Sequence, residues 1–444
     1  MKKLDAKITR MYKRRAEGKN NFFFELSKIQ RHFFKELPKW LGAVRDTRAQ
    51  GYITYQADII LMTMLMKNAT SVESMRTMDD AFNTDACVKN ICSLLGGRSL
   101  EVLPHHDTVN DFLEAVKPED LGWIRIKMIK ELLKGRSLEK YRIDGKYWGI
   151  IFDGTKLFHF KNRHCEHCLK KSRINQETGE VTEWYEHYVL EAKLVCGEMA
   201  LSIDSEFIEN ETEDVRKQDC EQNAFKRLAA RIKSQFKKLP ICVIADSLYC
   251  SGPVMDICKE YSWQYLLRFK SGSIPTIAEE FQAIAKMGEL ESNEDKAVNY
   301  VNGISYQKHL VNIMEMKDEN KKKETVTFTF ITSIVVTKRK AKELAAAGRS
   351  RWRIENEGFN TQKNHRYFIE HACSRNYTAM KNHYILTQIA DIWMQLFENG
   401  IKSVREMQCG IKRISSLLLE TIRTRILTEE DTLRIGETVQ IRFI

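Results

Sequence analysis

Apolar positions recur at helical spacing through the first 140 residues of the chain. This period predicts helices over residues 58–68, 72–82 and 121–134. Short helices in a basic context favour a helix-turn-helix-like reader of DNA, although a plain helical bundle has the same pattern. We therefore expect residues 1–140 to form a helical, basic, DNA-binding region.

The pattern changes near residue 141, where runs of β-branched and aromatic residues begin. One predicted strand contains Asp153, and two more flank the turn at Gly197 and Glu198. A short, wholly apolar segment before Asp246 is typical of a buried central strand. The predicted strands are 146–160, 186–196, 199–208, 239–245 and 264–269, with helices over 214–238 and 252–261. This order predicts an α/β fold with a mixed sheet flanked by helices.

Residues 276–337 alternate between polar and apolar positions and predict a β-rich insertion. From residue 338 the chain returns to helical spacing. We therefore divide the chain into a helical N-terminal region (1–140), the first part of the α/β core (141–275), the insertion (276–337), the second part of the core (338–400) and a C-terminal helical region with a tail (401–444).

Positive charge is concentrated near the N-terminus. The net charge is +11, and residues 1–50, with 14 Lys+Arg and five Asp+Glu, contribute +9 of it. Lys and Arg gain binding free energy by displacing counterions from nucleic acid, so we expect this segment, including Arg14 and Arg15, to bind DNA. The aromatic residues in the same segment fit an alternative interpretation, in which they form the core side of a solvated helix.

Composition excludes several classes of protein. The longest apolar run, about residues 59–66, is much shorter than the roughly 20 residues that a membrane-spanning helix needs. The basic N-terminus lacks the apolar segment of a secretory signal, and eleven cysteines without such a signal indicate reduced thiols. We expect a soluble cytoplasmic protein that associates with the nucleoid.

Two aspartates follow buried apolar segments. Asp153 comes after Gly-Ile-Ile-Phe, and Asp246 ends the run Ile-Cys-Val-Ile-Ala. Two facing carboxylates on neighbouring strands raise each other's pKa unless a cation lies between them, and carboxylate oxygens suit Mg²⁺. The alternative is ordinary turn chemistry after a strand. Asp144 and Asp204 compete for the same role, and we rank both lower.

A third acidic residue lies in the segment RSRWRIENEGFN, residues 349–360. On a helix, Arg351 and Glu355 are spaced i, i+4 and share one face. Glu357 is a fallback for Glu355, but two residues further on it turns to another face of the helix.

On these three segments, FDGTKLF with Asp153, VIADSLY with Asp246 and the helix with Glu355, the chain resembles the cut-and-paste DDE transposases of bacterial insertion sequences. The resemblance covers about residues 50–400. It implies a ribonuclease-H-like core interrupted by a β-strand insertion. It also implies that the chain cleaves transposon ends and joins them to target DNA by two-metal-ion phosphoryl transfer.

The resemblance further assigns roles to residues. Asp153, Asp246 and Glu355 would be catalytic and would hold two Mg²⁺ ions, for which Mn²⁺ can substitute. The partners implied are double-stranded DNA, as terminal inverted repeats and as target, and a second copy of the chain in a DNA-bound homodimer. The DNA-contacting residues would be Arg351, Lys363, Arg366, Arg349, Arg14 and Arg15.

The chain departs from the family in two places. The family's Tyr-Arg-Glu-Lys signature places its tyrosine at Gly348 and its lysine at Gln362, and Lys363 is the substitute we expect for the lysine. Some relatives stack a flipped base on a tryptophan of the insertion, but residues 276–337 contain none. Tyr300, Tyr306 or Phe328 would have to serve, and whether a DNA hairpin forms is left open.

The segment His164-Cys165-Glu166-His167-Cys168 is not explained by the resemblance. A Cys-x-x-Cys pair with nearby histidines can bind Zn²⁺, but a structural site needs further ligands, for which the candidates are His159, His164 and His187. For Cys165 and Cys168 we favour a polar loop that contacts DNA without zinc.

Two alternatives to a transposase remain open from the sequence. One is a related endonuclease that cleaves DNA without strand transfer. The other is a catalytically silent DNA-binding protein on a transposase scaffold, against which the presence of all three acidic residues argues.

Overall fold

The computed structural model describes residues 20–212, 217–319, 325–437 and 441–443. The chain folds as two compact units. The first unit is Met1–Ser137 with Asn360–Ile444, and the second is Leu138–Phe359. Arg14 and Arg15 lie outside the described residues.

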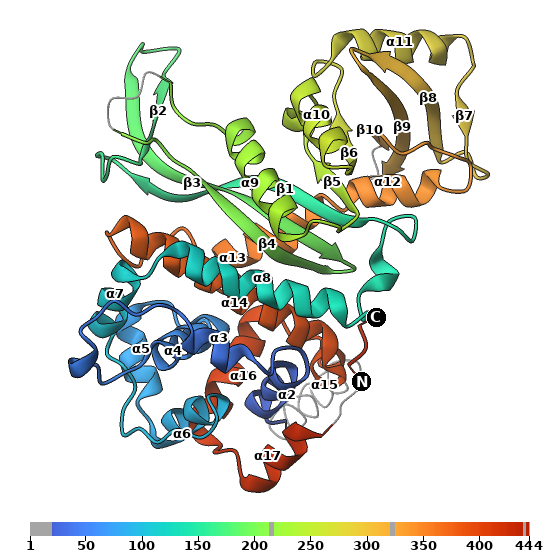
Figure 1. Ribbon diagram of the computed structural model, residues 1–444. Helices are drawn as coiled ribbons and strands as arrows, with labels where there is room; N and C mark the ends of the chain where they lie inside the picture. Colours follow the sequence, from blue (N-terminus) through green and yellow to red (C-terminus); the bar gives the residue numbers. More distant parts are fainter. Residues whose placement is uncertain (1–19, 213–216, 320–324, 438–440, 444) are drawn as a thin grey trace, which may run out of the picture. The chain divides into compact units, whose positions relative to one another are not determined.

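The described part of the first unit is a helical bundle built around the long helix α14 (Tyr377–Gly400), against which α2, α4, α7 and α8 pack (Figure 1). Helix α14 is buried on nearly every side, as a central helix must be. The other elements are α2 (Phe22–Phe33), α3 (Leu37–Gly42), η1 (Gln50–Tyr52), α4 (Ala57–Ala69), α5 (Met75–Phe82), α6 (Asp85–Leu94), α7 (His106–Ala115), α8 (Pro118–Lys134), α13 (Thr361–Asn364), α15 (Lys402–Glu406), α16 (Ile411–Thr424) and α17 (Glu429–Gly436).

The aromatic residues near the N-terminus belong to this core. Asn21 caps α2 by accepting a hydrogen bond from the amide of Phe24, and Phe22, Phe23 and Phe24 are all buried. Phe34, after the helix, is buried too. Of the two interpretations of this segment, the structure supports the one in which the aromatic residues form the buried side of a helix.

The second unit contains a mixed sheet that has ten strands among the described residues (Figure 1). The strands are β1 (Trp148–Phe160), β2 (Leu169–Ile174), β3 (Val181–Cys196), β4 (Met199–Ile208), β5 (Ile241–Ala245), β6 (Gln264–Phe269), β7 (Glu291–Ser292), β8 (Val298–Tyr306), β9 (His309–Glu319) and β10 (Thr325–Thr332). The helical segments are η2 (Glu139–Tyr141), α9 (Glu221–Gln235), η3 (Ser247–Tyr249), α10 (Gly252–Glu260), α11 (Pro275–Lys286), α12 (Ala341–Arg349) and the π-helix η4 (Ile354–Asn360).

The strand order defines the fold class. Strands β4, β3 and β1 are antiparallel neighbours, and β5 and β6 then continue the sheet parallel to β1. An antiparallel start followed by parallel strands with helical crossovers is the ribonuclease-H-like arrangement. The α/β fold expected from the sequence is therefore confirmed.

The insertion extends the same sheet. Strand β10 pairs antiparallel with β6, and β9, β8 and β7 follow outward in turn. Alternating polar and apolar positions indicate strands, but they do not reveal which strand of the core will accept them.

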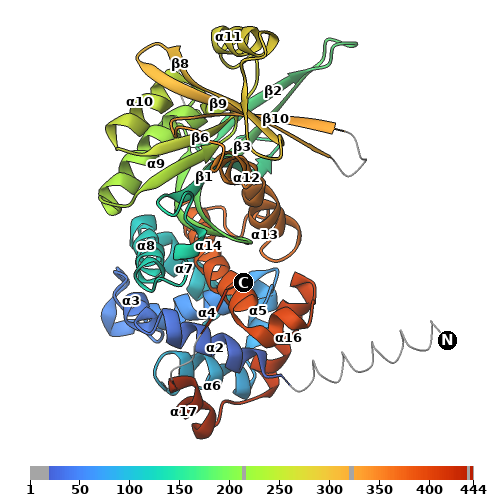
Figure 2. The same cartoon turned by 90° about the vertical axis from the view of Figure 1, so that its right-hand side faces the viewer.

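Helices cover both faces of the sheet in the two views (Figures 1 and 2). On one face the Phe152 ring of β1 meets the Phe225 ring of α9, with 5.0 Å between centroids. On the other face the neighbouring residue Ile151 joins a buried cluster with Leu344 of α12 and Ile354 of η4. Successive residues of β1 thus serve opposite faces, as the pleat of a strand requires.

Two local expectations from the sequence need correction. The basic stretch after β1 contains a strand, β2, which pairs with the start of β3. Its residues are exposed apart from Leu169, so it lacks the buried apolar pattern by which strands are recognised. The helix expected around Glu355 is interrupted and becomes the π-helix η4, a rare geometry that is frequent at functional sites.

Candidate active site

Asp153, within β1, lies next to Asp246, which follows the end of the paired strand β5. The parallel register of β1 and β5 places Phe152 opposite Ala245, so the residue that follows each of them is an aspartate. Asp246 leaves the strand at once, and its carboxylate accepts a 2.8 Å hydrogen bond from the amide of Leu248. The register of β1 and β5 alone therefore places the two predicted carboxylates side by side.

Near the Asp153 carboxyl, three other carboxylates outnumber the one nearby cation, Arg351. The Asp153 side chain is 17% exposed. Burial raises the pKa of Asp153 to about 7; Arg351 opposes this rise, and the nearby carboxylates of Glu355, Asp246 and Glu221 add to it. Like charges gathered in one place favour protonation unless a cation joins them.

Glu355 reaches the same place from the π-helix. Arg351 Nη1 lies 2.8 Å from Glu355 Oε1 and 3.4 Å from Asp153 Oδ2. The i, i+4 relation of Arg351 and Glu355 expected from the sequence is thus seen as an ion pair, although η4 is not a regular α-helix. Arg351 lies between the two acids and partly neutralises both.

Glu357, the fallback, faces another group. Its nearest cation is Arg353, 3.7 Å away, and Arg353 also binds Glu198 at 2.7 Å. It is not among the charged groups that most affect the pKa of Asp153.

A fourth carboxylate, Glu221, was not expected from the sequence. It is the first residue of α9, and it lies directly over Gly154. A Cβ atom at Gly154 would be only 2.6 Å from Glu221 Oε1, so a larger residue there would have to displace the carboxylate. Tyr249 Oη donates a 3.0 Å hydrogen bond to Glu221 Oε2, and burial raises the pKa of Glu221. Acidic residues are common in the first turn of a helix, where they interact favourably with the helix dipole. Nothing in the sequence therefore distinguishes Glu221 from such a residue.

The two competing aspartates are used elsewhere. Asp144 pairs with Lys340 at 2.8 Å, and Asp204 pairs with Arg231 of α9 at 2.6 Å. Both ion pairs join elements of the fold, which agrees with the lower rank that the sequence suggested for these residues.

Of the residues assigned to DNA, Arg351 and Arg349 lie in the second unit. The Arg349 guanidinium stacks on the Phe328 ring of the insertion, 4.2 Å from its centroid, and binds Asp318. Arg268 lies on the same ring at 5.0 Å. Phe328, a proposed base platform, is therefore already covered by arginines, while Tyr300, another, is buried and donates a hydrogen bond to Glu291.

Lys363 and Arg366 belong to the first unit. Lys363 is partly exposed and pairs with Glu370 at 3.1 Å. Arg366 is only 1% exposed; it binds Glu398 and donates a 2.9 Å hydrogen bond to Ser415 Oγ. That Arg366 contacts DNA phosphates stays a prediction, and in this structure its charge is paired inside the helical core. Gln362, at the family's lysine position, is also buried and donates to Asp391 at 2.8 Å.

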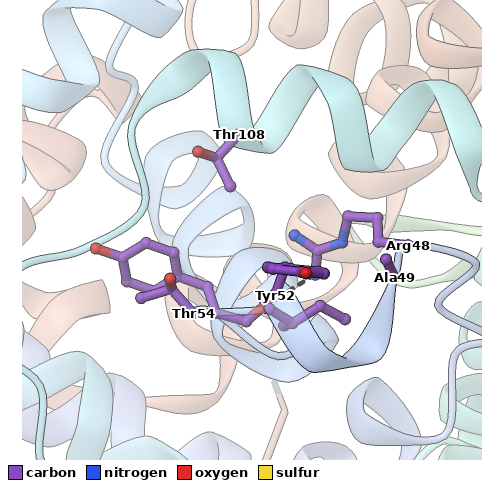
Figure 3. Close-up of a pocket in the computed structure, with 7 residues that line it drawn as sticks. Arg48, Ala49, Tyr52, Thr54 and Thr108 are labelled. Atoms are coloured by element: carbon purple, nitrogen blue, oxygen red, sulfur yellow. Dashed lines mark hydrogen bonds between the residues drawn. The ribbon is translucent and has the colours of Figure 1, made fainter.

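A shallow hollow of about 260 Å³ lies in the first unit, lined by Arg48, Tyr52, Thr54 and Thr108 among others (Figure 3). The Arg48 guanidinium is held there by Asp46 at 2.6 Å and by the carbonyl of Tyr55 at 2.7 Å. Its lining contains a guanidinium group and no carboxylate, unlike the surroundings of Asp153.

The carboxylate cluster suits divalent metal ions in chemistry. Asp153, Asp246, Glu355 and Glu221 offer hard oxygen donors, which are the ligands that Mg²⁺ prefers. The raised pKa of Asp153 indicates the negative charge that a bound cation would offset.

Comparison with known proteins adds the family. Residues 211–390 match the family described as the transposase DDE domain; this range includes Asp246 and Glu355 and begins after Asp153. The chain is also similar, at 10% identity and a TM-score of 0.42, to the piggyBac transposase in a cryo-EM structure of its synaptic complex with hairpin DNA, over 93% of this chain and 84% of that one. No curated protein matches the chain. Among the described residues, no helix is both long and apolar enough to cross a membrane. We conclude that residues 211–390 are similar to the transposase DDE domain.

Proposed function

We propose that this chain cleaves the ends of an insertion sequence and joins them to target DNA. The observation that carries the proposal is the meeting of Asp246 and Glu355 at Asp153, with Arg351 between Asp153 and Glu355, in a chain that matches the transposase DDE domain. In the proposed reaction, water attacks the phosphodiester at the transposon end and leaves a 3′-OH, which then attacks a phosphodiester of the target.

The three acids would hold two Mg²⁺ ions, with Glu221 supporting them. Bound metal ions of this kind lower the pKa of water and stabilise charge that develops on phosphate oxygens. The residues of the chain set the geometry: Leu248 fixes Asp246 through its amide, and Tyr249 fixes Glu221 through its hydroxyl.

Arg351 has a separate role in the proposal. In the metal-free arrangement its guanidinium partly neutralises Asp153 and Glu355. If bound cations took over that task, Arg351 would be available to the substrate, since guanidinium groups bind phosphate oxygens in a bidentate manner. Arg349, the last residue of α12, lies two residues before Arg351 in the chain and is paired with Asp318 of the insertion.

DNA is the proposed partner, as terminal inverted repeats and as target. The solved relative with the synaptic complex is itself bound to DNA. Because two transposon ends must be joined, we propose a homodimer on DNA, which light scattering of the chain with and without a terminal-repeat fragment would measure.

The direct test uses a matched pair of variants on one helix. The protein is incubated with Mg²⁺, a fragment carrying the terminal repeats that flank the gene, and a target plasmid. We expect wild type and Glu357→Gln to give strand-transfer product and Glu355→Gln to give none, because Glu355 shares Arg351 with Asp153 whereas Glu357 pairs with Arg353.

Other outcomes of this experiment would favour one of the two alternative functions. Cleavage without strand transfer would indicate an endonuclease, and DNA binding without cleavage would indicate a silent scaffold. Loss of activity in Glu357→Gln with activity kept in Glu355→Gln would show that the site is assigned to the wrong glutamate.

A further inference from the structure

Four possible zinc ligands meet at the base of the β2–β3 ribbon: His164, Cys165, Cys168 and His187. One donor atom from each lies within 4.8 Å of the others. We propose that these residues bind one structural Zn²⁺ ion, separate from the carboxylate site and not needed for its chemistry. This replaces the expectation of a metal-free loop.

The distances fit a tetrahedron around zinc. With Zn–S bonds of about 2.3 Å and Zn–N bonds of about 2.0–2.1 Å, tetrahedral geometry separates two sulfurs by about 3.8 Å and a sulfur from a nitrogen by about 3.5 Å. The two Sγ atoms of Cys165 and Cys168 are 3.7 Å apart. His187 Nε2 lies 3.4 Å from Cys165 Sγ and 3.5 Å from Cys168 Sγ.

The fold explains how the ligands meet. Leu169 pairs with Glu186 in the antiparallel β2–β3 ladder, so Cys168 lies beside His187. A turn closed by the Cys168 amide and the Cys165 carbonyl, 3.3 Å apart, brings the second thiol to the same point. Both Cys168 and His187 are 1% exposed.

The fourth ligand is held by aromatic stacking. The His164 ring stacks on Phe160 at the end of β1, with 4.6 Å between centroids and 13° between planes. Its Nδ1 atom is buried and has no hydrogen-bond partner among the described residues. Burying a polar nitrogen without a partner costs free energy, which a bond to zinc would recover.

A second layer supports the loop without occupying the ligand atoms. Arg163 donates to the carbonyl of Cys165 at 3.2 Å, and Asn210 donates to the carbonyl of Cys168 at 3.1 Å. His167, the remaining histidine of the segment, contacts the carbonyl of Asn210 at 3.0 Å and lies outside the cluster.

The site has a clear structural purpose. The β2–β3 ribbon reaches out from the sheet in both views (Figures 1 and 2), and five of the six residues of β2 are exposed. A two-stranded ribbon of this kind is marginally stable by itself. Zinc would fasten its base to β1 through residues from the β1–β2 loop and from β3.

The donor set argues for zinc over other occupants. Two thiolates and two imidazoles prefer Zn²⁺ to Mg²⁺, and four protein ligands fill the tetrahedron, as in structural sites. A disulfide would need about 2.05 Å between the sulfurs and would leave both histidines unexplained. Asp79, His105 and His106 form another group of possible ligands in the first unit, and the test must separate the two.

The test is metal analysis of the full chain. Wild-type protein from zinc-containing medium is reduced, desalted into Mg²⁺ buffer and measured by mass spectrometry for metals; we expect about one zinc per chain. Cys165→Ser, Cys168→Ser and His187→Ala should each lose it. The matched controls Cys220→Ser and His159→Ala, both exposed residues, should retain it, as should Asp79→Asn and Asp153→Asn.

A measurement on wild type covers the case in which a ligand variant fails to fold. With zinc replaced by Co²⁺, we expect a thiolate-to-cobalt charge-transfer band and the visible absorption of tetrahedral cobalt. We also expect Cys165 and Cys168 to resist alkylation until a chelator is added, while exposed Cys220 reacts at once. Wild type with only trace zinc, equal zinc in ligand variants and controls, or alkylation of all three thiols at the same rate would overturn the proposal.

Discussion

The carboxylate cluster and the Cys/His cluster both lie in the second unit but have opposite designs. Around Asp153, acids from four elements face each other with Arg351 between two of them, and Glu355 is 49% exposed. Around His187, soft donors already stand at tetrahedral spacing and are largely buried. Unbalanced charge open to solvent suits a site that admits metals and substrate, whereas a closed tetrahedron suits a site that holds structure.

The largest expected effect separates the two clusters by chemistry. Asp246→Asn should lower the cleavage rate by about 10²–10³-fold, because a charge that stabilises the transition state is removed. The fold should survive, since asparagine still accepts the hydrogen bond from the Leu248 amide. The measurement is the single-turnover cleavage rate, alongside zinc content and Tm.

Asp256→Asn is the control for that variant, because Asp256 is a surface acid paired with Lys308 at 2.9 Å. It should leave the rate unchanged. Equal rates for both variants would remove Asp246 from the site.

The next variant should lose stability and keep its cleavage activity, the reverse of Asp246→Asn. Replacing both Cys165 and Cys168 by serine should lower the Tm of the unit by about 10 °C, because several kcal/mol of metal binding free energy are lost. Mg²⁺-dependent cleavage by the protein that remains folded should change little. Differential scanning calorimetry checks the first expectation, and cleavage below the transition checks the second; an unchanged Tm would argue against a structural metal.

A third effect concerns pH and metal-free protein. The pKa of Asp153 is about 7 in the folded state, above its unfolded value, so folded protein holds this proton more tightly. Stability from this group is fully present below about pH 4 and is lost as the pH rises through 7. In EDTA, wild type should lose about 2 kcal/mol more than Asp153→Asn between pH 5 and pH 8.

Urea unfolding at both pH values measures this difference, and Asp256→Asn again serves as the control. Parallel curves for wild type and Asp153→Asn would show that the acids around Asp153 are better solvated than their positions imply.

These results show how far local sequence signals reach. Asp153 and Asp246 were predictable because each directly follows a run of buried apolar residues, and the Arg351–Glu355 pair was predictable because its spacing is fixed by helical geometry. Such signals lie within a few residues along the chain, and the structure brings them together as expected.

The features that sequence analysis missed depend on pairing between distant segments. His187 meets Cys168 only because the β2–β3 register sets them side by side, and β2 itself has no buried pattern to reveal it. Arg366 was assigned to DNA because it is basic, but Glu398, 32 residues away, neutralises it inside the core. Charge read from sequence does not show whether a partner lies in the fold.

Glu221 is the missed residue with the smallest expected effect, and it tests whether the carboxylate cluster has four useful members. Glu221→Gln keeps an acceptor for the Tyr249 hydroxyl, so the variant removes charge with little change of shape. If Glu221 helps to hold the metals, the cleavage rate should fall about tenfold, or about 1.4 kcal/mol, and the Mg²⁺ concentration for half-maximal rate should rise. Glu260→Gln, at the exposed end of α10, is the matched control. A lower Mg²⁺ requirement in Glu221→Gln would instead mean that Glu221 only repels Asp153 and Asp246, which would make the cluster a three-acid site.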